Sequence, residues 1–192
     1  MLINSASFVT SVASKNNILI DGLNQIAFVG RSNVGKSSLI NMLCNQKKLA
    51  KASSTPGRTR LINYFLINSK FYFVDLPGYG YAQASKTEAY GWQSLIEPYL
   101  INNDKLKLVC MLVDSRITPT EQDKQMFDYL AYYQLPFIII ATKSDKLSKA
   151  QLNKAKVNIA NTFGVGVENV YPVSNETRDG KDKVLSAISQ YV

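Results

Sequence analysis

A single loop of eight residues constrains the fold of this chain more than any other feature of its sequence. The loop reads GRSNVGKS, with glycines at Gly30 and Gly35 and the pair Lys36 and Ser37 at its end. An apolar run precedes it, and a segment of helical period follows it. A side chain at either glycine would obstruct a backbone that wraps around phosphates, and the helix points its positive end at the same anion. The order strand, loop, helix therefore predicts a phosphate-binding loop.

The other apolar runs place this phosphate loop in a mostly parallel sheet, because they alternate with helix-period segments as βα units do. Two runs are separated by only three residues, which is too short for a parallel crossover, so they form a hairpin. We expect a three-layer α/β fold of the P-loop NTPase type: a six-stranded sheet with one antiparallel strand and helices on both faces. The expected strands are Gln25–Val29, Ile62–Ile67, Phe71–Asp75, Lys107–Val113, Phe137–Ala141 and Asn169–Pro172. The expected helices are Lys36–Cys44, Lys86–Asn102, Thr120–Tyr133, Lys149–Phe163 and Lys181–Tyr191.

The length of 192 residues suits one domain. We expect residues 23–192 to form the nucleotide-binding domain and residues 1–22 to be an N-terminal extension or an edge strand. No secretory signal, membrane span or lipidation box is evident, so we expect a cytoplasmic protein, with a monomer as the default.

Composition limits the chemistry. Histidine is absent, which excludes histidine triads, histidine-ligated zinc and histidine general bases. Cys44 and Cys110 lie in apolar stretches without a metal-binding spacing, as buried reduced thiols do. The formal charge of +8 favours contact with a polyanion such as RNA, although a merely basic surface is the simpler alternative.

Three motifs in this order predict a guanine nucleotide site. In the phosphate loop, Lys36 reaches the β- and γ-phosphates and the Ser37 hydroxyl binds Mg²⁺. At the end of a strand, Asp75 holds the metal and Gly78 offers an amide to the γ-phosphate. After a later strand, Asp145 accepts both donors of guanine in a fork and rejects adenine, which would leave the carboxylate unpaired. The residues expected around the nucleotide are Gly30, Arg31, Ser32, Asn33, Val34, Gly35, Lys36, Ser37, Ser38, Asp75, Leu76, Pro77, Gly78, Thr142, Lys143, Ser144, Asp145, Val173, Ser174 and Asn175.

Each motif also has a simpler explanation. The phosphate loop is otherwise a glycine-rich turn without ligand, and Ser144 with Asp145 is otherwise a helix cap. The order of the motifs favours the nucleotide site. In such a nucleotide site, we expect the Lys143 stem to lie over the base and Val173 to Asn175 to supply an amide to the guanine O6.

A threonine between the first helix and the hairpin is expected to fold over the γ-phosphate. We choose Thr59 as this switch threonine, with its hydroxyl on Mg²⁺, and Thr55 is the competitor. The neighbouring Gly57 and Arg58 are included in the nucleotide site. The metal ligands are then Ser37, Thr59 and Asp75, and the residues expected to act in hydrolysis are Lys36, Thr59, Gly78 and Asn33.

These residues resemble the EngB-type ribosome-biogenesis GTP-binding proteins of the TrmE-Era-EngA-EngB-Septin-like P-loop GTPase superfamily. The resemblance runs from about Phe8 to the C-terminus and is most specific in Thr55–Thr59 and Asp75–Ala82. It implies a Ras-like G domain that binds GTP and GDP with Mg²⁺. It also implies a role in maturing the large ribosomal subunit, needed for growth and division, and it supports Thr59 as a magnesium ligand.

Two positions differ from related GTPases. Thr142 replaces the asparagine usual in the superfamily, which is expected to loosen the tie between base pocket and phosphate loop and to give modest affinity. Tyr79 stands where Ras-like proteins have the glutamine that orients water, so we expect slow hydrolysis. An asparagine at the position of Asn33 helps to coordinate a potassium ion in several related GTPases. The alternative for Asn33 is hydrogen bonding within the loop.

Basic and aromatic residues flank the expected switches. We expect rRNA contact there, with cations on phosphates and tyrosines stacked on bases, against the alternative of core aromatics and a solvated basic loop. These residues are Lys47, Lys48, Lys51, Arg58, Arg60, Tyr79 and Tyr81.

Other functions stay open: a nucleotide kinase or ATPase, which Thr142 to Asp145 disfavours, or a non-catalytic RNA-binding assembly factor. A tRNA-modification or iron-transport GTPase is disfavoured, because no extra domain or membrane segment is present.

Overall fold

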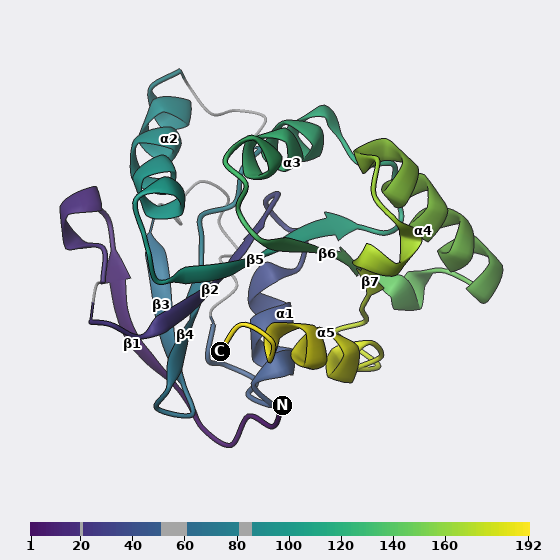
Figure 1. The fold of residues 1–192 in the computed structure, drawn as a ribbon. Coiled ribbons are helices and arrows are strands. Elements are labelled where there is room, and N and C mark those ends of the chain that lie inside the picture. Colours follow the sequence, from purple (N-terminus) through teal and green to yellow (C-terminus); the bar gives the residue numbers. More distant parts are fainter. Residues whose placement is uncertain (20, 51–60, 81–85) are drawn as a thin grey trace.

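A seven-stranded sheet lies between two layers of helices (Figure 1). The computed structural model describes residues 1–19, 21–50, 61–80 and 86–192, and of residues 86–93 it describes the backbone alone. The strands are β1 (Ala6–Val12), β2 (Asn24–Gly30), β3 (Ile62–Ile67), β4 (Phe71–Asp75), β5 (Leu106–Asp114), β6 (Phe137–Thr142) and β7 (Val170–Pro172). The α-helices are α1 (Lys36–Leu43), α2 (Lys86–Ile101), α3 (Glu121–Tyr132), α4 (Lys149–Phe163) and α5 (Lys181–Ile188). Short 3₁₀ helices are η1 (Lys15–Asn17), η2 (Ser144–Lys146) and η3 (Val167–Asn169).

The strand order is β1-β3-β4-β2-β5-β6-β7. Strand β3 runs antiparallel to both of its neighbours, β1 and β4, whereas β4, β2, β5, β6 and β7 pair in parallel. One antiparallel strand is therefore confirmed. The sheet has seven strands rather than six, because the N-terminal segment pairs with β3 from Ala6 opposite Ile67 to Val12 opposite Ile62.

Two hydrophobic cores hold the layers together. The core on one face joins the sheet to α2, α3 and α4, with Ile96, Leu130 and Ile159 fully buried. The core on the other face joins it to α1 and α5, through side chains such as Leu39 and Ile188. The expected helices on both faces are confirmed.

The carboxyl ends of the parallel strands lie at the same end of the sheet. In register, Asp75 at the end of β4 is opposite Phe28 in β2, and Asp114 at the end of β5 is opposite Thr142 at the end of β6. Loops that follow parallel strands form the ligand crevice of open α/β sheets. The three motifs therefore meet at this end of the sheet, although the first and the last lie more than a hundred residues apart in the sequence.

Among the helices that the structure describes, none has the length and apolar character needed to cross a bilayer.

Candidate nucleotide-binding site

The phosphate loop connects β2 to α1 in a conformation that requires its two glycines. Gly35 is the N-cap of α1 and has a φ of 106°, which favours glycine. A Cβ at Gly30 would lie 2.9 Å from the carbonyl oxygen of Leu112 in the next strand, so no side chain fits there. The first N–H groups of a helix have no acceptor within it, and α1 directs these donors and its positive end toward the loop. The loop therefore has the form of an anion-binding site.

A lysine, a serine and an aspartate converge beside this loop. The Lys36 Nζ lies 3.2 Å from Oδ1 of Asp75, and the Ser37 hydroxyl donates to Oδ2 of the same carboxylate at 3.3 Å. Asp75 is 5% exposed, and its Oδ1 accepts no hydrogen bond within the described part of the chain. The strand end β4 and the first turn of α1 thus bring together a cation, a hydroxyl and a buried carboxylate.

These oxygens fit a magnesium ion that is shared with phosphates. Mg²⁺ prefers hard oxygen ligands and is bound by one or two protein ligands together with phosphate oxygens and water. The Ser37 hydroxyl and the Asp75 carboxylate are such ligands. The residues that the structure describes hold no cluster of three or more histidines, cysteines or carboxylates, so a metal cage built from the protein alone is absent from them.

The segment after β4 runs alongside the phosphate loop. The amide of Ser32 donates to the carbonyl of Tyr79 at 3.0 Å, and the amide of Tyr79 donates to the carbonyl of Gly30 at 3.3 Å. A Cβ at Gly78 would come within 3.0 Å of the Ser32 nitrogen. Gly78 therefore lies against the loop, and a side chain there would require the backbone at Ser32 to shift.

The Tyr79 side chain belongs to the core and is not available for base stacking. It is 8% exposed, and its hydroxyl donates to Oδ1 of Asp123 at 3.0 Å. Burial, and then the charge of Asp123, raise the pKa of Tyr79 well above its usual value. Asp123 is also the capping-box residue of α3, with Thr120, and its Oδ2 lies 3.4 Å from Nε of Arg31. The expected RNA stacking by Tyr79 is wrong, because the ring packs between the sheet and α3.

The base-recognition candidate Asp145 lies in η2, directly after β6. Its Oδ1 accepts the hydroxyl of Ser174 at 2.9 Å, and its Oδ2 lies 3.1 Å from Nζ of Lys146. Burial alone would raise the pKa of Asp145, but the hydrogen bonds from Lys146 and Ser174 lower it below its usual value. The carboxylate is therefore ionised and oriented, as recognition of two adjacent donors requires.

The hydroxyl of Thr142 ties the base side to the phosphate loop. This buried hydroxyl lies 2.7 Å from the carbonyl of Val34 and 3.1 Å from that of Val113. The side-chain amide of Asn175 likewise donates to the carbonyl of Gly35 at 3.3 Å. The amide of Ser144 also donates to the carbonyl of Val173 at 3.2 Å. The three loops thus form one connected unit.

The sequence analysis missed two residues of this unit, Asp114 and Arg116. Asp114, at the end of β5, contacts Lys143 and Arg116, and Lys143 in turn contacts the phosphate loop. One signal would have identified these two residues: Asp114 is a charged residue at the carboxyl end of a buried strand, where the three motifs also lie.

Several expected site residues lie outside the described residues. They are Thr55, Gly57, Arg58, Thr59 and, in the expected RNA surface, Lys51, Arg60 and Tyr81. Lys47 and Lys48 are exposed directly after α1.

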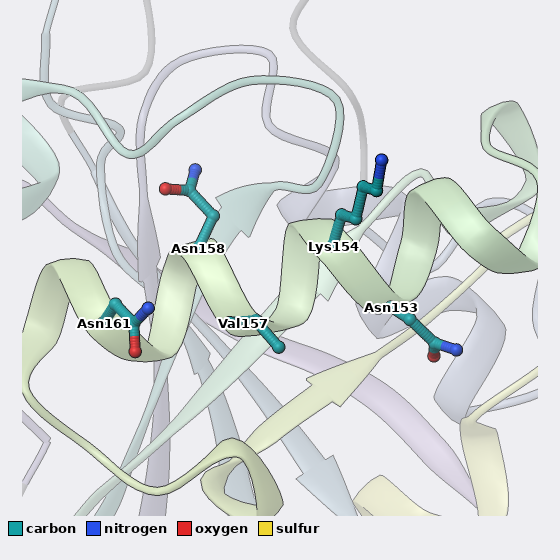
Figure 2. Close-up of a pocket in the computed structure, with 5 residues that line it drawn as sticks. All are labelled: Asn153, Lys154, Val157, Asn158 and Asn161. Atoms are coloured by element: carbon teal, nitrogen blue, oxygen red, sulfur yellow. The ribbon is translucent and has the colours of Figure 1, made fainter.

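A cavity of about 430 Å³ lies elsewhere, on the outer face of α4. Figure 2 shows its five side chains projecting from this single helix. None of them belongs to the three motifs. They are Asn153, Lys154, Val157, Asn158 and Asn161.

Comparison with known proteins agrees with this geometry. Residues 25–143 match the family model described as 50S ribosome-binding GTPase. A probable GTP-binding protein EngB from Clostridium acetobutylicum is 49% identical over 189 residues, which cover 98% of this chain and 94% of that protein. A second, from Clostridium beijerinckii, is 49% identical over 186 residues, with 96% and 94% covered.

Solved structures share the fold. The crystal structure of a probable GTP-binding protein EngB has a TM-score of 0.74 at 24% identity, with 87% of this chain and 97% of that chain covered. The FeoB G-domain from Methanococcus jannaschii has a TM-score of 0.60 at 25% identity, with 88% and 96% covered. Because the family model spans more than half of the chain and the EngB relatives match almost all of it, this chain belongs to the 50S ribosome-binding GTPase family, in its EngB group of GTP-binding proteins.

Proposed function

We propose that this protein binds GTP and GDP with Mg²⁺, hydrolyses GTP slowly, and switches with its nucleotide during assembly of the large ribosomal subunit. We place it in the cytoplasm as a monomer, with a role in growth and division. The nucleotide part rests on one observation. Lys36, Ser37 and Asp75 converge at the carboxyl ends of the parallel strands, and the oriented Asp145 carboxylate lies at the same end of the sheet. The description of the matching family, 50S ribosome-binding GTPase, supports the ribosomal part.

In this proposal each group has one task. The amides of the phosphate loop and Lys36 bind the phosphates, and Gly78 contributes an amide on the γ-phosphate side. Asp145 accepts the two guanine donors, and the Lys143 stem covers the base. Ser37 and Asp75, together with Thr59, would hold the magnesium ion. When bound, Mg²⁺ offsets the charge of the phosphates during the transfer to water.

Slow hydrolysis follows from the residue after Gly78. A side-chain amide at that position orients water in Ras-like proteins. Here the position holds Tyr79, whose hydroxyl is directed at Asp123 of α3. A second group therefore has to assist, and we propose a potassium ion at Asn33, which is exposed on the phosphate loop. Turnover measured in matched potassium and sodium buffers tests this; equal rates would remove the potassium ion from the proposal.

Nucleotide selection gives the decisive experiment. Calorimetric titration of GTP, ATP and xanthosine triphosphate should show that the wild type prefers GTP. Asp145→Asn presents an amide in place of the carboxylate, so preference should move to xanthosine triphosphate. Asp128→Asn, an exposed change on α3, is the matched control and should keep the wild-type preference. A wild type that binds no nucleotide, or an Asp145→Asn variant that still prefers GTP, would contradict the proposed function.

Ribosomal contact is tested separately at Lys47 and Lys48. Counterion release makes binding to RNA strongly salt-dependent, and each lost phosphate contact lowers that dependence. Charge reversal of both lysines should therefore weaken binding to the large subunit and flatten its salt dependence. Reversal at exposed Lys15 and Lys70 is the control. Unchanged binding in the first variant would exclude this surface.

A further inference from the structure

The Lys143 side chain is held at its far end. Its Nζ donates to Oδ2 of Asp114 at 2.9 Å and to the carbonyl of Asn33 at 3.0 Å. One acceptor lies at the end of β5 and the other in the phosphate loop, so the ammonium is fixed from two separate elements. A free lysine side chain has many rotamers, and holding it removes most of them. The methylene stem of Lys143 is thereby presented in one conformation beside Asp145.

The Asp114 carboxylate is itself held on its other side. Arg116 donates to it from Nε at 3.0 Å, from Nη2 at 2.8 Å and from its own backbone amide at 3.0 Å. The Asp114 side chain is 7% exposed, whereas that of Arg116 is 47% exposed. Burial alone would raise the pKa of Asp114, but the hydrogen bonds from Arg116 and Lys143 lower it well below its usual range. Asp114 is therefore a charged, oriented acceptor for Lys143.

A purely local explanation accounts for part of this geometry. The bond from the Arg116 amide to Asp114 is a short turn of the kind that aspartate forms with the residue two positions later. Such a turn requires one oxygen of Asp114. It does not require the second oxygen to lie between Arg116 and Lys143, nor Lys143 to span from β6 to the phosphate loop.

We propose that Asp114, held by Arg116, is a positioning residue for guanine binding: it fixes the Lys143 ammonium so that the lysine stem forms the surface on which the base lies. This inference rests on the proposed function, because it assumes that the base occupies the side of the crevice beside Asp145. Without the Asp114 charge, the ammonium moves toward solvent and the stem leaves the base. The loss falls on nucleotide affinity, since among the described residues the side chain of Asp114 bonds to Arg116 and Lys143 and not to Lys36, Ser37 or Asp75.

A double-mutant cycle tests this coupling. Calorimetry with GDP compares the wild type, Asp114→Asn, Lys143→Met and the double variant. We expect Asp114→Asn to bind GDP about tenfold more weakly, as for loss of one charged hydrogen bond. The double variant should bind no more weakly than Lys143→Met alone, because Asp114 acts through Lys143. In turnover, KM for GTP should rise about as much as the GDP dissociation constant, with kcat within about twofold.

Two further variants keep the test decisive. Arg116→Ala changes a half-exposed side chain, so it should fold and lose several-fold in GDP affinity in the wild-type background but nothing in the Lys143→Met background. Asp128→Asn on α3 is the matched control and should bind as the wild type does. Losses that multiply in the double variant, or unchanged GDP affinity in both Asp114→Asn and Arg116→Ala, would overturn the inference. A wild type that fails to bind GDP contradicts the proposed function instead.

Discussion

The two sides of the crevice are built differently. On the base side, the loops are joined to one another by hydrogen bonds, such as Thr142 to Val34 at 2.7 Å and Ser174 to Asp145 at 2.9 Å. On the phosphate side, the charged groups meet one another: Lys36 lies 3.2 Å from Asp75, and Ser37 donates to the same carboxylate at 3.3 Å. The base side is thus held by the protein, whereas on the phosphate side the proposed ligand-binding groups are each other's partners.

This difference suggests how the proposed binding divides its tasks. Selection of guanine requires a carboxylate that is already oriented. A base without the two donors of guanine would leave this carboxylate unpaired and would therefore bind more weakly. Gripping phosphates and magnesium requires groups that can exchange partners. Lys36 can leave Asp75 for a phosphate, and the carboxylate would then be free to hold the metal ion together with Ser37. Four predictions test the comparison, starting with the largest expected effect.

Removing the phosphate-side cation should have the largest effect. Lys36→Ala deletes contacts to two phosphates, so GTP affinity should fall about 100-fold or more. Calorimetry with GTP and magnesium measures this. Lys70→Ala, in the exposed β3–β4 turn, is the control and should bind normally. A loss below about tenfold would mean that Lys36 belongs to the Asp75 ion pair rather than to a phosphate.

On the base side, Thr142→Val should act on stability. The change leaves the Val34 and Val113 carbonyls without the buried hydroxyl, so the free energy of unfolding should fall by about 1–2 kcal/mol. Urea denaturation without nucleotide measures it. Thr162 also donates to a backbone carbonyl at 2.7 Å, but on the outside of α4. Thr162→Val should change the free energy by less than about 0.5 kcal/mol. An equal loss of unfolding free energy in the two variants would mean that the Thr142 hydroxyl stabilises the protein no more than the Thr162 hydroxyl does.

Ser174→Ala should weaken GTP binding about three- to fivefold at neutral pH, because Asp145 loses one of its orienting hydrogen bonds. That bond also lowers the pKa of Asp145, so the variant carboxylate takes up a proton at a higher pH than the wild-type carboxylate does. GTP affinity should therefore begin to fall at a higher pH in the variant, and the difference should widen between pH 7.5 and 4.5. Ser189→Ala, at the C-cap of α5, is the control. A constant ratio would argue that Ser174 does not act through the Asp145 charge.

The smallest effect on nucleotide turnover and binding is expected at Tyr79. Tyr79→Phe deletes one of several donors to Asp123, so the free energy of unfolding should fall by about 1 kcal/mol. Turnover and binding to the large subunit should stay within about twofold, because the hydroxyl faces α3. Thermal and urea denaturation, followed by both functional assays, measure this. Faster or slower turnover would place the hydroxyl in the hydrolysis step after all.

Local patterns predicted most of the fold. Strand β3, strand β4 and helix α4 have the expected bounds, since hydrophobic period and capping residues such as Ser148 determine them. The sequence leaves the pairing of β1 open, because Ala6–Val12 lacks the pattern of a strand with one buried face, and in the structure Phe8 and Val9 are exposed. Only contact with β3 decides that it is a strand.

The sequence by itself determined the order of the three motifs and the glycines at Gly30 and Gly35, and it predicted guanine over adenine, because spacing and residue chemistry suffice for these. Only the tertiary structure decided that Tyr79 is buried against Asp123, that Thr142 closes the base side, and that Asp114 lies beside Lys143. The physical reason is that each of these contacts joins residues from segments that are far apart along the chain. Their distance depends on sheet register and helix packing, which residue spacing along the chain does not encode.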